Sequence, residues 1–569
     1  MLDFDHVLLE IGEFGRYQRF VVLLLIVPAC FMNAYNSFGL VMLTYTPKHR
    51  CASPLSAINS TSAMNYSSVS YERCSVNYFL DGQSEPALTE PCQQWTYDKD
   101  IFDETLITRF NLVCDRAIIS KNIVAIMQVS SIVGCFLSAY IQDTFGRKMA
   151  FIFIVSTYVF GGVTSVFMPS VTTFIIARSF AAMHTISGWN ISYIWALEYV
   201  GPSKRTLVTT VYCTVYGIGM MTLAGWAYVL RDWQHLGVAI SAPFILLLSY
   251  CYLVHESPRW LLGAGKYDRC RAVIKTINKW EQSNKKSRKT SLAALDDVIT
   301  RLHAEQMEEN PDFDGSTDTT ATYLDLFRGA NLRMKTVLIT FCWVANALVY
   351  TTIAYNTENI GDNLLVTWTL TAAVEAPATI SNLLVLNRYG RVLPMVSGMI
   401  IAGLCCIGTA PGSAAGVWFV VFLTMVGKFF ISMTFGIICQ LAGELYPTVA
   451  RGVGTGLSAT FGLLGQTTMP YIVHAAAAYK FLPMVVIGIV AIIGGCTSLF
   501  LPETLGQSMP QTLADAESHG NVGTGAFRGH CHRLKLILTC RDLSKNKNAV
   551  LQCIEEEEAN EAEAADAML

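Results

Sequence analysis

The chain is poor in charged residues. Only 15% of its 569 residues are Asp, Glu, Lys or Arg, whereas 52% are hydrophobic. A soluble protein of this length needs far more charge to cover its surface. The formal net charge of −3 leaves no basic footprint for DNA or RNA, so we expect no nucleic-acid partner. The composition therefore predicts a protein whose main partner is the lipid bilayer.

Catalytic and cofactor motifs are missing as well. The sequence has no Walker-type nucleotide loop, no recognisable Ser/His/Asp arrangement and no Cys/His spacing typical of zinc. We therefore expect no cofactor, no metal and no enzymatic activity. The N-terminal segment lacks the pattern of a cleavable signal peptide, so the first apolar run is expected to anchor the chain.

Long apolar runs are abundant instead. A membrane-spanning helix needs about 18 or more consecutive, largely apolar residues. The runs predict an all-α membrane protein with twelve transmembrane helices, six in each half. The expected spans are residues 20–43, 122–141, 149–168, 172–199, 207–230, 236–254, 335–355, 364–386, 392–410, 417–441, 452–473 and 481–501.

The polar segments complete the predicted organisation. In chain order, we expect a cytoplasmic N-terminus (1–19), the first helix (20–43), a large extracellular loop (44–118), the rest of the first lobe (119–254), a cytoplasmic linker (255–334), the second lobe (335–502) and a cytoplasmic tail with a disordered acidic end (503–569).

Three charged landmarks occur twice, about 245 positions apart. Gly146-Arg147 returns as Gly390-Arg391, Glu198 with Arg205 returns as Glu444 with Arg451, and Glu256 returns as Glu503. Three landmarks in the same order at nearly one offset indicate an internal duplication. In a membrane protein, parallel halves of this kind are typical of a transporter with two pseudo-symmetric lobes.

Positive charge gathers in short loops on one side of the predicted spans. The positive-inside rule places that side in the cytoplasm, so both termini lie inside and residues 44–118 lie outside. The residues that carry this argument are Arg147, Lys148, Lys204, Arg205, Arg388, Arg391 and Arg451.

The predicted extracellular loop carries two kinds of modification signal. Four cysteines in one exofacial loop suit two disulfides, and all three connectivities are open. Asn59 and Asn65 each begin an acceptor sequence for glycosylation, which requires an exofacial loop. The cysteines are Cys51, Cys74, Cys92 and Cys114.

The repeated charged landmarks are candidate gating residues. Acids and bases at the cytoplasmic level could form ion pairs between helices that hold this side shut in one state and break in the other. The alternative is a set of solvated residues that only mark topology. The candidates are Asp143, Arg147, Glu198, Arg205, Arg391, Glu444 and Arg451.

Glu375 is the most informative single residue. It lies near the middle of an otherwise uncharged span, where an ionised side chain costs about 2.5–3.5 kcal/mol on insertion scales. Such a residue faces a protein interior or an aqueous cavity. Pro377 removes a backbone donor two residues later and is expected to kink the helix. We predict a substrate-binding or coupling role, with a structural ion pair as the alternative.

A mid-span lysine and several aromatic residues are further candidates for the substrate site. Lys428 lies too deep to reach the interface easily, and it could pair with Glu375 or receive a substrate carboxylate. Aromatic rings beside a buried acid can hold an organic ammonium, although packing or lipid contact would also explain them. The aromatic candidates are Tyr193, Trp343, Tyr350 and Phe429. Arg178 lies nearer the outer end of its span, where snorkelling would account for it.

A combination of longer motifs is distinctive. It consists of Cys92-Gln93-Gln94-Trp95, Asn111-Leu112-Val113-Cys114, Arg231-Asp232-Trp233, Glu256-Ser257-Pro258-Arg259-Trp260, Gly427-Lys428-Phe429 and Glu444-Leu445-Tyr446-Pro447-Thr448. Together they resemble the organic cation, carnitine and organic anion carriers of the major facilitator superfamily, solute carrier family 22. The resemblance implies the major facilitator fold and alternating access at the plasma membrane, with the substrate site between two lobes.

Two positions bear on the substrate. Glu375-Ala376-Pro377 matches the Glu-x-Pro pattern of the cation and carnitine carriers in that family. Leu463 stands where the family's cation and anion carriers have charged residues, and Asn387 replaces the acid usual in the second turn. The resemblance implies a carrier of small organic cations or zwitterions, carnitine-like or amine-like, and a Glu375–Lys428 pair suits a zwitterion.

Other functions stay open at this point. The alternatives are an organic anion carrier of the same family, a sugar-porter-like facilitator and a membrane receptor that binds without transport. The seventh span lacks the paired glutamines of sugar porters, and such porters lack the long cysteine loop. A coupling ion, sodium or proton, is possible.

Overall fold

The computed structural model describes most of the chain. The described residues are 7–8, 14–52, 68–80, 85–86, 88–280, 292–301, 323–361, 363–447, 450–474, 481–505, 510, 513–518 and short runs between 522 and 530. The predicted glycosylation sites Asn59 and Asn65 and the acidic end of the tail lie outside these residues and stay predictions.

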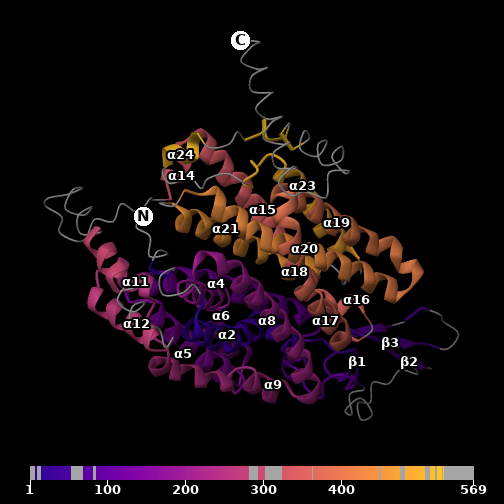
Figure 1. Cartoon of the computed structure of the whole chain (residues 1–569). Coiled ribbons are helices and arrows are strands. Elements are labelled where there is room, and N and C mark those ends of the chain that lie inside the picture. The colour runs from indigo at the N-terminus through magenta and orange to yellow at the C-terminus, as the bar shows by residue number, and fades with distance from the viewer. Residues whose placement is uncertain are drawn as a thin grey trace, which may run out of the picture.

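Helices from the first half of the chain form one lobe (Figure 1). Several of them begin at a capping residue: Ser170 accepts the N–H of Thr173, and Asp232 accepts two N–H groups of the following turn. The elements are α2 (Arg16–Leu43), α4 (Ala117–Thr144), α5 (Arg147–Ser165), α6 (Val171–Ala182), α7 (Ser187–Leu197), α8 (Pro202–Val229), α9 (Trp233–Ala239), η3 (Ala242–Ser249) and α10 (Tyr250–Leu253).

Helices from the second half form the other lobe, which lies alongside the first (Figure 1). Its elements are α15 (Ala330–Tyr355), α16 (Thr357–Ile360), α17 (Leu364–Ala373), α18 (Glu375–Tyr389), α19 (Val392–Gly412), η4 (Ser413–Ala415), α20 (Val417–Leu445), α21 (Arg451–Gln466), α22 (Met469–His474) and α23 (Leu482–Ser498). The connection between the lobes includes α11 (Pro258–Gly263), α12 (Tyr267–Trp280) and α14 (Asp325–Arg328).

Each predicted span has a helical counterpart, but some are interrupted. In the described part of the chain, nine helical segments are long and apolar enough to cross a membrane. The fourth span is divided into α6 and α7, and the eleventh into α21 and α22. The break after α6 lies where α4 approaches closely, because a Cβ on Gly134 would overlap the backbone of Met183. The exact count of twelve transmembrane helices stays a prediction.

The large loop after α2 contains short strands, which the all-α prediction did not include. β1 (His49–Cys51) pairs antiparallel with β5 (Trp95–Tyr97), and a second antiparallel sheet has the order β2 (Ser68–Tyr71), β3 (Ser75–Phe79), β4 (Leu88–Pro91). Strand pairing satisfies backbone groups that an irregular polar loop would leave to solvent. Two short helices, α3 (Leu106–Phe110) and η2 (Cys114–Arg116), lead into α4.

Two disulfides hold this loop together. The structure pairs Cys51 with Cys92 and Cys74 with Cys114, each with a Cα–Cα distance of 5.6 Å. The second bridge ties the sheet to the residue that begins the approach to α4. His49 lies near Cys74 and Cys114, but both cysteines are disulfide-bonded and therefore offer no thiolate to a metal.

The lobes are packed together at the end that carries the strands, which we call the loop end. The core of the first lobe is continuous with buried residues of α15, α17 and α22, including Ala354, Trp368 and Val473. At the opposite end, which carries α11 and α12 and which we call the linker end, the core of the second lobe forms a cluster of its own around Leu386, Leu445 and related residues. Among the described residues, the hydrophobic core shared by the two lobes thus lies toward the loop end.

The tail contains an ordered element that the sequence did not predict. α24 (Leu513–Ser518) lies against the start of α15, where the Glu517 carboxylate accepts the backbone N–H groups of Asn331 and Leu332, both at 2.8 Å. The first N–H groups of a helix have no partner within the helix, so a carboxylate is stabilised there. The predicted tail therefore holds an ordered segment ahead of its acidic end.

Candidate functional site

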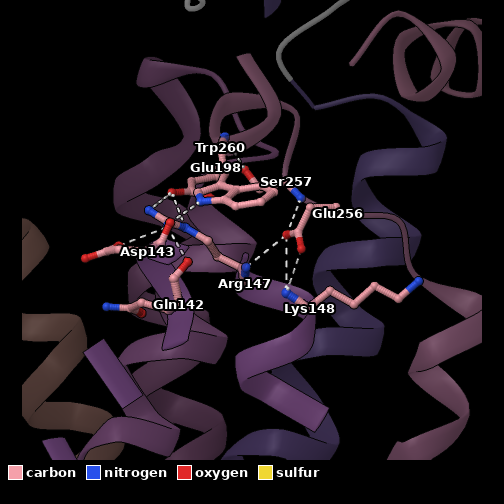
Figure 2. Close-up of polar contacts among 8 residues, drawn as sticks. All are labelled: Gln142, Asp143, Arg147, Lys148, Glu198, Glu256, Ser257 and Trp260. Carbon is pink, nitrogen blue, oxygen red and sulfur yellow. Dashed lines mark hydrogen bonds and ion pairs between the residues drawn. The ribbon is translucent and has the colours of Figure 1, made fainter. Parts of the chain in front are cut away.

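The repeated turns at the linker end have the same construction in both lobes. Gly146 and Gly390 adopt φ values of +105° and +83°, a conformation that side chains with a Cβ rarely adopt. In the first lobe, Glu256 accepts the backbone N–H groups of Arg147 at 3.1 Å and Lys148 at 3.2 Å (Figure 2). Burial raises the pKa of the Glu256 carboxyl, and these N–H donors counteract that rise.

The second lobe repeats these backbone hydrogen bonds at the equivalent residues. Glu503 accepts the backbone N–H groups of Arg391 at 2.8 Å and Val392 at 3.2 Å. A Cβ on either turn glycine would overlap the carboxylate that caps the next helix. The duplication seen in the sequence therefore extends to the hydrogen bonds of each turn.

The candidate gating residues form ion pairs, and the pairs join helices of the same lobe. Arg147 lies 3.1 Å from both Asp143 and Glu198, as Figure 2 shows. Arg391 lies 2.9 Å from Glu444 in the second lobe. These pairs bind the linker-end termini of helices within each lobe to one another. Their role as a gate that opens and closes stays a prediction.

The remaining two gating candidates lie at the same end. Arg451, at the start of α21, interacts electrostatically with Glu444. Arg205 lies in the first turn of α8 and interacts electrostatically with Tyr193. Each therefore contacts a residue of its own lobe.

The structure brings Glu375 and Lys428 together. Oε1 of Glu375 and Nζ of Lys428 lie 2.8 Å apart, and the two side chains are 9% and 1% exposed. Lys428 comes from the middle of α20, and its Nζ lies 3.1 Å from the centroid of the Tyr350 ring. An ammonium held between a carboxylate and an aromatic face is stabilised by both.

An interruption of the helix backbone places Glu375 beside Lys428. α17 ends at Ala373 and α18 begins at Glu375, so the span is interrupted directly before the acid. Pro377 explains the interruption, because it has no N–H to donate to the carbonyl of Ala373 and its ring crowds that carbonyl. The expected kink is therefore found, and the acid occupies the first turn of the second segment.

The acid faces the other lobe rather than lipid. A Cβ on Gly217 of α8 would lie 2.9 Å from Cβ of Glu375, so the two helices are in close contact at this level. Tyr216 and Cys213, also on α8, interact electrostatically with Glu375. The group formed by Glu375, Lys428 and Tyr350, which we call the central triad, therefore lies where the two lobes meet.

The other aromatic candidates make their described contacts elsewhere. Tyr193 forms a hydrogen bond of 3.0 Å with Thr209 and stacks on Trp189. Trp343 faces Gly462 of α21, and Phe429 packs edge-on against Phe430. The structure thus groups one of the four predicted rings, Tyr350, with the buried ion pair.

Residues that join the lobes were missed in the sequence. Nε1 of Trp368 donates to the carbonyl of Met220 at 2.8 Å, and the Tyr355 hydroxyl donates to the carbonyl of Ser37 at 3.2 Å. Phe38 packs against Trp368 with ring centroids 5.4 Å apart. Large aromatic residues near the loop-end termini of the spans could have pointed to these contacts. A belt of aromatic residues at the membrane interface would explain the same pattern equally well.

Comparisons with known proteins agree with one another. A family model described as "Sugar (and other) transporter" matches residues 55–513. A β-alanine transporter of Drosophila melanogaster is 30% identical, covering 91% of this chain and 89% of that protein, and an organic cation transporter protein of the same species is 31% identical, covering 91% and 95%. The human organic cation/carnitine transporter 2 is 27% identical over 90% of this chain and 94% of its own length.

Solved structures are similar at the level of the fold. The xylose transporter XylE from E. coli, in a partially occluded inward-open conformation, matches with a TM-score of 0.58 and 13% identity. The match covers 86% of this chain and 99% of that protein.

Proposed function

The chain belongs to solute carrier family 22 of the major facilitator transporters, and we propose that it carries small organic cations or zwitterions across the plasma membrane by alternating access. The central triad is the observation that carries this proposal. An ammonium paired with a carboxylate and seated on a ring is how a protein holds an organic ammonium. Relatives named for organic cations, carnitine and β-alanine also support it.

In this proposal Lys428 acts as an internal substitute for the substrate cation. Its ammonium neutralises Glu375, which would otherwise be a buried charge without a partner, at a cost of several kcal/mol. An arriving ammonium group takes the position beside Glu375 and over Tyr350, and Lys428 moves aside.

Charge balance favours a zwitterion within this class. When a zwitterion enters, its ammonium pairs with Glu375 and its carboxylate pairs with Lys428, so two pairs replace one. A purely cationic substrate leaves Lys428 without a partner, and the site returns to neutrality only if Lys428 releases its proton. We therefore propose that proton coupling accompanies transport of a cation and is not required for a zwitterion.

Access to the triad follows from the arrangement of the lobes. The shared core closes the loop end, whereas the described residues at the linker end form no such core between the lobes. With the loop outside, as its cysteines and the positive-inside rule predict, this is a state closed to the outside. Alternating access then requires the loop-end contacts to separate and the linker end to close.

An uptake panel on the full-length chain tests the proposal. The panel compares β-alanine, carnitine, a quaternary ammonium, an aromatic amine, an organic anion and xylose, each with and without sodium and with and without a proton gradient. We expect saturable accumulation of zwitterions and cations, with proton dependence confined to the cations.

Other outcomes identify the alternatives. Accumulation of the anion alone makes the chain an organic anion carrier, and accumulation of xylose alone makes it a sugar porter. Binding without accumulation makes it a receptor. Any of the three overturns the proposal.

A further inference from the structure

A second buried charge lies away from the central triad, in the first lobe. Arg178 comes from the middle of α6, and its side chain is 2% exposed. Snorkelling to the interface, which the sequence suggested, is therefore wrong. A Cβ on Gly162 of α5 would lie 3.6 Å from Nη1 and one on Gly39 of α2 would lie 3.8 Å from Nη2, so the guanidinium sits between these helices.

No acid among the described residues neutralises this arginine. Both terminal nitrogens, Nη1 and Nη2, are buried and lack a hydrogen-bond partner there. The ionisable groups that interact with it are the hydroxyls of Tyr158 and Tyr355. Each hydroxyl donates its proton to a backbone carbonyl, that of Ile240 and that of Ser37 respectively, so neither supplies a negative charge.

Arg178 cannot avoid the cost of burial by becoming neutral. The guanidinium keeps its proton in proteins, and an unpaired buried charge costs several kcal/mol. Buried polar groups in native structures have partners, and a buried guanidinium without one calls for a ligand.

Arg178 lines a small cavity that can hold such a ligand. The other lining residues are polar for the most part: Asn36 and Ser37 from α2, Gln128 from α4, Thr185 after α6, and Tyr355 from the second lobe. The cavity has a volume of ≈ 20 Å³ for the centre of a water-sized ligand, which is room for about one water or one monatomic ion. A whole organic substrate does not fit.

We infer that this cavity, which we call the Arg178 cavity, is a binding site for one small anion. Its ligands are the two free guanidinium nitrogens, with amide and hydroxyl donors from the surrounding side chains. Chloride matches the volume and the charge. A carboxylate that reaches in from a larger molecule offers the same single negative charge.

The position of Tyr355 connects this site to the movement of the lobes. Tyr355 is contributed by α15 of the second lobe, and its hydroxyl bonds to Ser37, which also lines the cavity. Tyr355, which covers the Arg178 cavity from the second lobe, is therefore also part of the contact that closes the loop end. A bound anion stabilises the state in which the loop end is closed, and it exchanges when the lobes separate there.

Thermal unfolding of the purified full-length chain tests the site without any substrate. Chloride is titrated against methanesulfonate, a bulkier anion without a carboxylate, at constant ionic strength, and Tm is measured for the wild type, Arg178→Gln, Arg178→Lys and Arg109→Gln. We expect a saturable rise in Tm with chloride in the wild type and in Arg109→Gln, in which an exposed arginine of the loop is changed. The rise is lost in Arg178→Gln and partly kept in Arg178→Lys.

Further arms cover the source of the anion and a variant that fails to fold. If acetate replaces chloride and competes with it, a carboxylate group is the natural ligand and the anion site stands. If Arg178→Gln cannot be purified, Gln128→Leu tests the same cavity and should weaken the chloride response. Indifference of the wild type to both anions, or an unchanged response in Arg178→Gln, overturns the inference and leaves the proposed transport function untouched.

Discussion

Lys335, Lys428 and Arg178 are buried cations among the described residues, and the last two, which lie deeper in their spans, meet the cost of desolvation in different ways. Lys428 is paired with Glu375 at 2.8 Å, whereas Arg178 has no acid beside it in the described structure. Removing one member of a buried pair leaves the other uncompensated at a cost of about 3–5 kcal/mol. The effects of substitutions at these two positions therefore differ in kind.

Replacement of Glu375 tests the central triad. Glu375→Gln removes the carboxylate that we propose holds the substrate ammonium, and it leaves Lys428 uncompensated, so we expect uptake of a cationic substrate to fall by at least about tenfold. The measurement is initial uptake normalised to the amount of protein at the cell surface.

A double variant separates binding from folding. Glu375→Gln with Lys428→Met removes both charges, so surface expression is expected to recover while uptake stays low. Glu90→Gln, which changes an exposed acid of the loop, is the control and should behave as the wild type. Uptake that persists in the double variant would remove the triad from the substrate site.

The sequence could single out the acid but not its whole environment. A charged side chain in an apolar span is conspicuous in any sequence, and this feature identifies both Glu375 and Lys428. The sequence could not show which of the predicted aromatic residues lies beside Glu375, because the direction of an aromatic side chain depends on how its helix is rotated. Tyr350 lies on the ion pair, whereas Tyr193 and Phe429 pack elsewhere.

At the scale of elements, apolar length set most of what could be predicted. The helix starts and ends follow the apolar runs closely, and Pro377 correctly indicated the interruption before α18. The break between α6 and α7 could not be predicted in this way, because no proline marks it. It lies where α4 approaches closely at Gly134. The order in α24 was also missed, because it depends on a contact with α15 that is distant in sequence.

The two disulfides should act on the folding and delivery of the loop. Cys51→Ser with Cys92→Ser removes one complete bridge and leaves no unpaired partner, at a cost of roughly 2–4 kcal/mol to the loop. We expect surface delivery to fall several-fold while uptake per delivered molecule changes little.

The control exchanges two exposed cysteines that are outside the bridges, Cys251→Ser with Cys496→Ser. This variant should reach the surface as the wild type does. Normal delivery of the bridge variant would mean that the loop is stable without this disulfide.

Docking of α24 on α15 should depend on pH. The N–H groups of Asn331 and Leu332 hold the pKa of Glu517 below its usual value, and Lys335 adds to this effect. A carboxyl with a lowered pKa stabilises the docked tail above its ordinary pKa, and the stabilisation is lost as pH falls through the lowered value.

Limited proteolysis of the tail in the purified protein measures this docking. Glu517→Gln imitates the protonated form, so at neutral pH the tail should be cleaved several-fold faster than in the wild type. Asp268→Asn, which changes an exposed acid of α12, is the control. Equal cleavage rates in all three proteins would show that Glu517 does not hold the tail.

At the scale of the whole molecule, the internal duplication was the strongest sequence signal. It predicted two lobes, and the paired turns at Gly146 and Gly390 carry the same carboxylate cap. The resemblance to the organic cation and carnitine carriers is confirmed by relatives that cover nine-tenths of the chain. The state of the transporter could not be predicted, because one sequence must be compatible with every conformation of the cycle.

Trp368 makes one of the buried contacts that close the loop end between the lobes. Its side chain is 1% exposed, and its indole N–H donates to the Met220 carbonyl. Trp368→Phe keeps the ring contact with Phe38 but removes the donor, which costs the closed state about 1–3 kcal/mol. Since about 1.4 kcal/mol is a factor of ten, the equilibrium should shift toward the outward-open state by roughly five- to 150-fold.

Accessibility of the interface measures this shift. A cysteine introduced by Leu40→Cys, at a buried position of the Arg178 cavity, should react faster with a membrane-impermeant thiol reagent when Trp368→Phe is also present. Trp226→Phe, in which a half-exposed tryptophan of α8 is changed, should leave the rate as it was. Because the same separation removes Tyr355 from the anion cavity, chloride should slow the reaction, and a rate indifferent to Trp368 would mean that the loop end is held shut by other contacts.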